Sequence, residues 1–194
     1  MLQRAEYGVT SSAHRLRKIV WGAAAILLLL PLVAMQFTDQ VAWTGVDFAV
    51  FGVMLAITGA GIELTLRVTD RAAYRAGACI ALAAAFMLVW VNGAVGIIGN
   101  ENNPANLMYG GVLAVAVLGA LVARFRPPGL ARAMVAAAIA QVLVLAVALF
   151  AVPGAEGPKW PLDTIFLTGF FVALWLVAAW FFHRGAGTTG RART

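Results

Sequence analysis

Six long apolar runs, separated by short stretches of charged and turn-forming residues, constrain this chain more than any other feature of its sequence. They cover residues 18–37, 43–66, 72–98, 107–125, 130–152 and 162–182. Each run holds 19 to 27 residues, and about 20 residues in a helix cross the hydrocarbon core of a bilayer. Because lipid cannot satisfy exposed backbone groups, each run is expected to be helical. We therefore predict an all-α, polytopic membrane protein built as a six-helix transmembrane bundle.

The composition argues against the other classes of protein. Of the 194 residues, 62% are hydrophobic and 11% are charged, whereas a soluble domain is about half apolar and a quarter charged. One core of this size could not bury so much apolar surface. A soluble enzyme, a disordered chain and a coiled coil are thus excluded. Runs such as GAAAILLLLPLVAM do not alternate as transmembrane strands do.

The first run also has a basic segment in front of it, as a signal peptide does. Its apolar stretch is about 19 residues long, compared with about 7–15 in a typical signal peptide. We expect it to remain in the protein as a membrane span.

The basic residues predict the orientation of the six spans. With an even number of spans both termini lie on one side, and that side collects thirteen of the fourteen Lys and Arg residues. Positively charged residues mark cytoplasmic loops, so we predict both termini in the cytoplasm. The same bias explains the net charge of +6, so we do not expect nucleic acid as a partner. We expect anionic lipid at the cytoplasmic face instead.

The chain is expected to contain one membrane domain with two short ends. Residues 1–17 form a basic cytoplasmic segment, residues 18–183 the six-helix domain and residues 184–194 a cytoplasmic tail. The tail and the first twelve residues are expected to be disordered. Consecutive spans form three hairpins with polar outer turns, and a true triplication is an alternative to the ordinary recurrence of such turns.

The outer side of the predicted bundle is acidic. It carries five of the eight carboxylates, and Lys159 is its one basic residue. The five are Asp39, Asp47, Glu101, Glu156 and Asp163. Asp47 and Asp163 begin spans that enter from outside, where a carboxylate stabilises a helix N-terminus. The alternative is a vestibule that attracts cations.

Asparagines gather between the third and fourth runs, in the segment NENNPAN of residues 100–106. Pro104 is expected to begin the fourth helix with Asn103 as its cap, and Glu101 lies in the turn before it. Asn92 lies within the third span, where an amide needs a partner. Bonding between helices is the common outcome, and contact with a ligand is the alternative.

Two polar side chains lie deeper in the predicted bundle. Glu63 precedes Arg67 by four residues, the favourable spacing for an ion pair on one helix. A role for Glu63 in proton relay or substrate binding is the alternative. Gln141 lies near the middle of the fifth span and is expected to bond another helix, through Thr58 or Thr168.

Motifs of known chemistry are missing from the sequence. It has no phosphate-binding loop, zinc motif or nucleophile elbow. Its one cysteine, Cys79, lies in an apolar run, and both histidines lie near the ends of the chain. We therefore expect no catalytic residue, no metal site and no cofactor.

The segments LLLLPLVAMQFTDQVAWTGVDFAVFGVMLA and LVWVNGAVGIIGNENNPANLMYGG resemble a family of small, uncharacterised polytopic proteins of the bacterial inner membrane. The resemblance extends from about residue 18 to residue 183. It implies a multi-pass topology in that membrane, and it implies no activity or substrate.

Three functions remain open from the sequence. The first is a non-catalytic accessory or assembly component of a larger membrane complex or homo-oligomer, which the many small residues favour. The second is a small transporter or channel for a small solute or cation, using the polar residues of the spans. The third is a membrane-embedded enzyme that uses the outer carboxylates.

Overall fold

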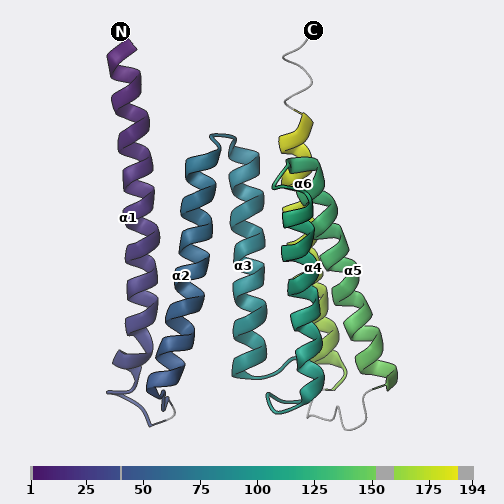
Figure 1. Cartoon of the computed structure of the whole chain (residues 1–194). Helices are drawn as coiled ribbons and strands as arrows, with labels where there is room; N and C mark the ends of the chain where they lie inside the picture. Colours follow the sequence, from purple (N-terminus) through teal and green to yellow (C-terminus); the bar gives the residue numbers. More distant parts are fainter. Residues whose placement is uncertain (1, 40, 152–159, 188–194) are drawn as a thin grey trace. The chain divides into compact units, whose positions relative to one another are not determined.

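The computed structural model describes residues 2–39, 41–151 and 160–187 (Figure 1). These residues contain helices and connecting turns, with no strand among them. The helices are α1 (Leu2–Ala34), α2 (Gly45–Val68), α3 (Ala72–Ala94), α4 (Met108–Val122), α5 (Pro127–Ala151) and α6 (Leu162–Gly187). A single 3₁₀ turn, η1 (Pro104–Leu107), precedes α4. Six segments of 19 to 25 residues are long and apolar enough to cross a membrane, so the chain is an all-α, multi-pass membrane protein.

The third and fourth helices are shorter than the apolar runs predicted. The run that ends at Ile98 is helical only to Ala94. The chain turns at Gly96, which has a φ of 68°, and a Cβ there would lie 2.3 Å from the carbonyl carbon of Asn100. At the other end of α4, the positive φ of Arg124 and Phe125 stops the helix at Val122.

Other helices are longer than predicted. Pro127 and Pro128 begin α5, because proline is tolerated in a first turn, where the amides have no helical acceptor. The predicted fifth run began only at residue 130. The first residues of the chain are helical from Leu2, and α6 continues to Gly187. The remaining part of the tail, residues 188–194, lies outside the described residues, as do Glu156 and Lys159.

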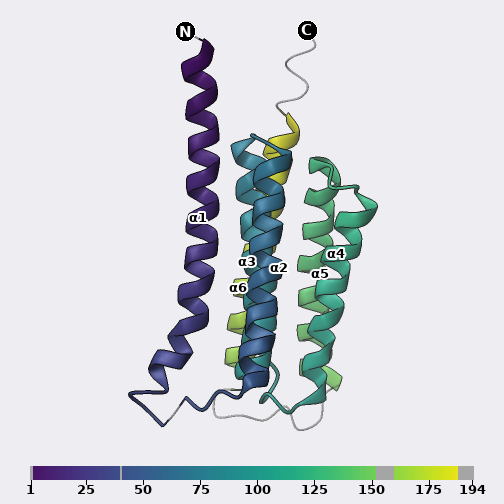
Figure 2. The same cartoon turned by 60° about the vertical axis from the view of Figure 1, so that its left-hand side comes forward.

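The helices group into two compact units, which are described separately here: residues 1–70 and residues 71–194. Unit 1 is the hairpin of α1 and α2 (Figures 1 and 2). Two glycines of α2 face α1: a Cβ at Gly59 would lie 3.6 Å from the Trp21 ring, and one at Gly52 would lie 3.8 Å from Leu28, both at ordinary contact distance. At the N-terminal end of α2, the Trp43 ring packs on Phe48 and Phe51, with centroid distances of 5.2 and 5.3 Å.

Unit 2 contains α3, α4, α5 and α6, and its packing order differs from its order in sequence. α6 packs between α3 and α5, and α4 packs on α5, whereas α3 and α4 touch little. The second predicted hairpin is therefore not a packing unit, unlike the α5–α6 hairpin. The buried residues of α6 recur every three or four positions, as one face of a helix does: Phe171, Trp175, Ala178 and Phe182.

Candidate functional site

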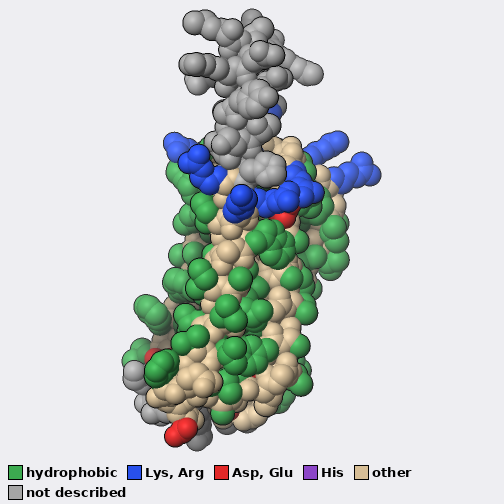
Figure 3. Space-filling model, turned by 90° about the vertical axis from the view of Figure 1, so that its left-hand side faces the viewer, with side chains coloured by type: hydrophobic (Ala, Val, Ile, Leu, Met, Phe, Trp, Pro, Cys, Tyr) green, Lys and Arg blue, Asp and Glu red, His purple; other side chains and the backbone are tan. Residues whose placement is uncertain are grey.

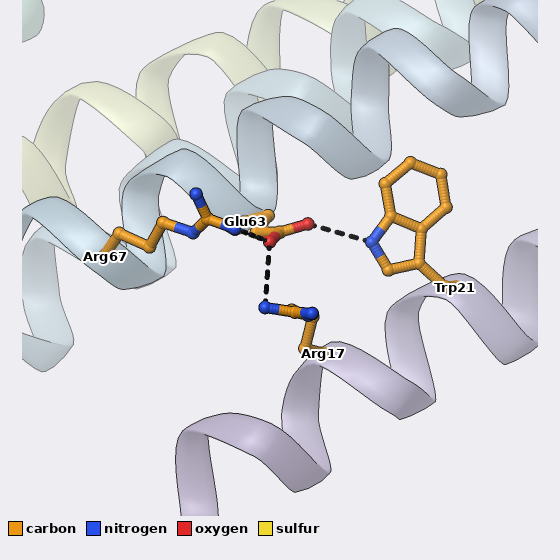
Figure 4. A network of polar contacts seen from close by, with 4 residues as sticks. All are labelled: Arg17, Trp21, Glu63 and Arg67. Atoms are coloured by element: carbon orange, nitrogen blue, oxygen red, sulfur yellow. Dashed lines mark hydrogen bonds and ion pairs between the residues drawn. The ribbon is translucent and has the colours of Figure 1, made fainter. Parts of the chain in front are cut away.

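Glu63 lies at the centre of a polar network that joins the two helices of unit 1 (Figure 4). The predicted ion pair with Arg67 on the same helix is present. Two residues of α1 complete the network: the Trp21 indole N–H donates to Glu63 Oε2 at 2.9 Å, and Arg17 Nη1 lies 3.6 Å from Glu63 Oε1. Arg67 is close because it lies four residues further along α2, whereas Arg17 and Trp21 come close because α1 packs on α2. The carboxylate thus links the helices at their basic end.

Figure 3 shows the basic side chains gathered at that end of the hairpin, with apolar side chains along its length. Arg15, Arg17 and Lys18 on α1 and Arg67 on α2 belong to this end. One carboxylate, that of Glu63, bonds two guanidinium groups there. Its side chain is 15% exposed. Both carboxylate oxygens have partners within the unit, which supports the structural interpretation of Glu63 over a proton relay.

Asp47 has the capping role that its position predicted. Asp47 Oδ2 accepts from the backbone N–H and the hydroxyl of Thr44, each at 2.7 Å, and the Thr44 hydroxyl oxygen accepts from the Asp47 N–H. This reciprocal pair is a capping box at the start of α2. Asp163 lies exposed in the first turn of α6, where its charge favours the helix N-terminus. Both carboxylates therefore have a helix-stabilising role.

The asparagine-rich loop of unit 2 is organised by a residue to which sequence reasoning gave no role. Asn106 Oδ1 accepts from the N–H groups of Ile97 and Ile98, at 3.0 and 2.9 Å. Asn106 Nδ2 donates to the carbonyls of Ile98 and Asn100. Its side chain is buried, so the loop folds around it.

A second anchor of this loop comes from α6. The Thr164 hydroxyl donates to the Ile97 carbonyl at 2.7 Å, and Thr164 is buried. Asn103 is a cap, as predicted, but of the 3₁₀ turn η1 and not of α4, which begins at Met108: its side chain accepts from the Ala105 N–H at 3.0 Å. Glu101 remains exposed, bonded to Asn102. The loop between α3 and α4 is thus a defined structure with an exposed polar tip.

Among the described residues, Asn92 and Gln141 do not form the hydrogen bonds between helices that we expected. The Asn92 amide donates to the Leu88 carbonyl on its own helix at 3.1 Å, and its oxygen is buried without a partner. Neither the nitrogen nor the oxygen of the Gln141 amide has a hydrogen-bond partner among the described residues. Thr58, one of the proposed partners of Gln141, bonds the Met54 carbonyl of its own helix.

Gln141 belongs to a group of buried polar side chains in the interior of unit 2. Its side chain is fully buried, as are Tyr109 on α4 and Thr168 and Trp175 on α6. The polar atoms of all four have no hydrogen-bond partner in the described structure. We call these four residues the interior polar group.

Three of the four residues lie at successive depths along α5 and α6. At about 1.5 Å per residue, Thr168 is about 9 Å and Trp175 about 20 Å below the start of α6. Gln141 is about 15 Å below the end of α5 on the same count, which places it between them. Thr168 and Trp175 share one face of α6 with Thr164, since residues four and seven apart lie on one face. The group therefore extends inward from the anchored outer loop.

Sequence reasoning singled out Gln141 in this group and named Thr168 as one of its two expected partners. The spacing of Thr164, Thr168 and Trp175 on one helical face was a signal that was available in the sequence. Trp175 lies in the middle of α6 and is buried. Nothing in the sequence singled out Tyr109.

The chemistry available to the interior polar group is hydrogen bonding without charge. It offers the donors and acceptors of an amide and two hydroxyls, and an indole donor. Among the described residues, no three His, Cys, Asp or Glu side chains are placed to hold a metal ion.

Comparison with protein-family models, curated proteins and solved structures finds no match for this chain. Its function is therefore inferred from the chemistry of its own residues.

Proposed function

We propose that the protein is a non-catalytic accessory or assembly component of the bacterial inner membrane, with both termini in the cytoplasm. The observation that carries the proposal is how its polar side chains are used. Asp47 and Asn103 cap helices, Glu63 joins α1 to α2, and Asn92 bonds its own helix. These residues stabilise the protein's own fold, which leaves its helix faces as the surface for partners.

Unit 1 supports this role because its first helix is almost uncovered. Between residues 15 and 34, only Pro31 is buried. Ile26 on this helix is 67% exposed. A helix with an apolar surface of this extent contacts lipid or another protein surface along most of its length. The inner-membrane location is supported by the resemblance of the sequence and by the distribution of its basic residues.

Purification in mild detergent with site-specific photo-crosslinking tests the accessory role. A photoreactive residue at Ile26 on the outward face should capture a second protein. The same residue at Leu28, which faces Gly52 of the hairpin, should capture only this chain and serves as the matched control. A monodisperse protein with no crosslink to another chain at Ile26 would contradict the proposal.

A second candidate function, a transporter or channel for a small uncharged solute, is favoured by the interior polar group. Buried membrane amides without partners are costly, and in membrane proteins they often mark a pathway for a solute. The group offers donors and acceptors at successive depths but no charge, which suits an uncharged solute better than a cation. Osmotic swelling of proteoliposomes that contain the Gln141→Leu variant distinguishes this candidate from a purely structural interior.

A further inference from the structure

The turn between α4 and α5 has a fixed and unusual backbone. Arg124 and Phe125 have positive φ values of 50° and 56°, in succession and without glycine. The Phe125 N–H donates to the Ala120 carbonyl at 3.1 Å, which closes the end of α4. The Tyr74 hydroxyl of α3 donates to the Phe125 carbonyl at 3.0 Å. The side chains of the turn are therefore held by a defined backbone.

A pocket of about 450 Å³ lies at this turn. Three arginines line it: Arg124, Arg126 and Arg132. Its lining contains no Asp or Glu side chain. Within residues 2–39, 41–151 and 160–187, no carboxylate forms an ion pair with these three guanidinium groups. We call this site the arginine pocket.

The arginine pocket differs from the basic end of unit 1, where Glu63 bonds two arginines. Its three arginines are exposed, and no carboxylate of the described residues pairs with them. An anion bound between them would therefore reduce the mutual repulsion of their guanidinium groups. Gly129, in the first turn of α5, also lines the pocket. Its N–H lies at a helix N-terminus, which adds a weaker attraction for negative charge.

The shape of the surroundings indicates the source of the anion. Val122 and Phe125 flank the arginines and are 84% and 54% exposed. The pocket also lies at the ends of two segments that are long enough to span a membrane, where lipid headgroups begin. Arginine binds phosphate oxygens through two parallel N–H donors. A phospholipid carries both a phosphate and acyl chains. Arginine N–H donors can bind the phosphate, and the neighbouring apolar side chains can contact the acyl chains.

We propose that the arginine pocket binds the phosphate group of an anionic phospholipid headgroup. The arginines hold the phosphate oxygens, and Val122 and Phe125 contact the first carbons of the acyl chains. This is a particular site rather than the general attraction of a basic surface for acidic lipid. It goes beyond the accessory role and requires only that α4 and α5 span the membrane.

Native mass spectrometry of the full chain, released from nanodiscs of phosphatidylcholine with increasing phosphatidylglycerol, tests the proposal. The wild type should retain one phosphatidylglycerol molecule in a saturable manner. The double variant Arg126→Gln/Arg132→Gln should bind it at least about tenfold more weakly, since each basic residue near the surface contributes roughly a fivefold preference. The control Arg15→Gln/Lys18→Gln removes the same charge from unit 1 and should retain the lipid.

Two results would overturn the proposal. Equal loss of lipid in the pocket variant and in the control would show only general attraction to a basic surface. Displacement of the lipid by millimolar inorganic phosphate would assign the pocket to a soluble phosphate ion instead of a headgroup. Because the saturable binding is measured on the wild type, the test does not depend on the folding of a variant. Circular dichroism of both variants verifies that they remain helical.

Discussion

At the scale of single residues, local spacing predicted several contacts and failed where partners come from another helix. Asn103 and Asp47 act within three residues of their own positions, so the cap could be read from the order of residue types. The Glu63–Arg67 pair follows from helical spacing alone. Trp21, which bonds Glu63 from 42 residues away, has no such signal. A partner on another helix depends on how the helices pack, which local spacing does not encode.

The interior polar group is the residue-scale feature with the clearest energetic consequence. The Gln141 amide is buried with neither of its polar atoms paired in the described structure. If the interior is dry, Gln141→Leu removes this desolvation cost and should raise the free energy of unfolding by about 1 kcal/mol. Thermal or denaturant unfolding in detergent measures the change. Ile139→Leu, on the exposed face of the same helix, is the matched control and should have little effect.

The same variant tests the solute pathway. If Gln141 lines a pathway, osmotic swelling of proteoliposomes in a small uncharged solute should be faster with the wild type than with Gln141→Leu. A stability gain with equal swelling of both proteins would contradict the transporter candidate. Destabilisation of the variant by more than about 1 kcal/mol would instead show that the amide has partners in the membrane.

At the scale of helices, the positions of the six spans were predictable, whereas their ends and neighbours were less so. Apolar length identifies a span because the bilayer sets that length. It does not identify the last turn: α3 stops at Ala94 because Gly96 turns the chain, and the apolar run simply continues. It also does not identify neighbours. α3 packs on α6 through Gly77, whose missing Cβ would lie 3.2 Å from the Ala178 carbonyl oxygen.

The close packing of α4 on α5 leads to a prediction for two glycines of one helix. A Cβ at Gly119 would lie 2.7 Å from Ala133 Cβ and 3.3 Å from its Cα. Since backbone cannot move as a side chain can, Gly119→Ala should push the helices apart and lower the free energy of unfolding by about 1–3 kcal/mol. A Cβ at Gly111 meets nothing within 4 Å. Gly111→Ala should therefore be neutral, or stabilising by about 0.5 kcal/mol.

Unfolding of the two variants under one detergent condition provides the comparison. The difference between Gly119→Ala and Gly111→Ala is more informative than either value, since both replace a glycine of α4 by alanine. Equal stability of the two variants would show that α4 and α5 are not in close contact at Gly119.

At the scale of the whole molecule, the contacts between helices define two compact units, and each has its own polar organisation. Unit 1 balances its basic end with Glu63. Unit 2 has the anchored outer loop at one end of its helices and the arginine pocket at the α4–α5 turn. Hydropathy treats all six spans alike and could not separate the units, because the division depends on which helices touch. The charges, in contrast, were visible in the sequence, and they predict the orientation of the molecule.

The orientation leads to a prediction that also tests whether α3 spans the membrane. Asp70 lies exposed between α2 and α3, next to Arg67, Arg71 and Arg75 in sequence, and Asn102 lies exposed in the outer loop beyond α3. Basic residues resist translocation, so the connection at Asp70 should face the cytoplasm. In a Cys79→Ala background, Asn102→Cys should react with a membrane-impermeant maleimide in cells whose outer membrane is permeable to it. Asp70→Cys should react only after the inner membrane is opened. The reverse pattern would invert the orientation, and labelling of both positions before opening would show that α3 does not cross the membrane.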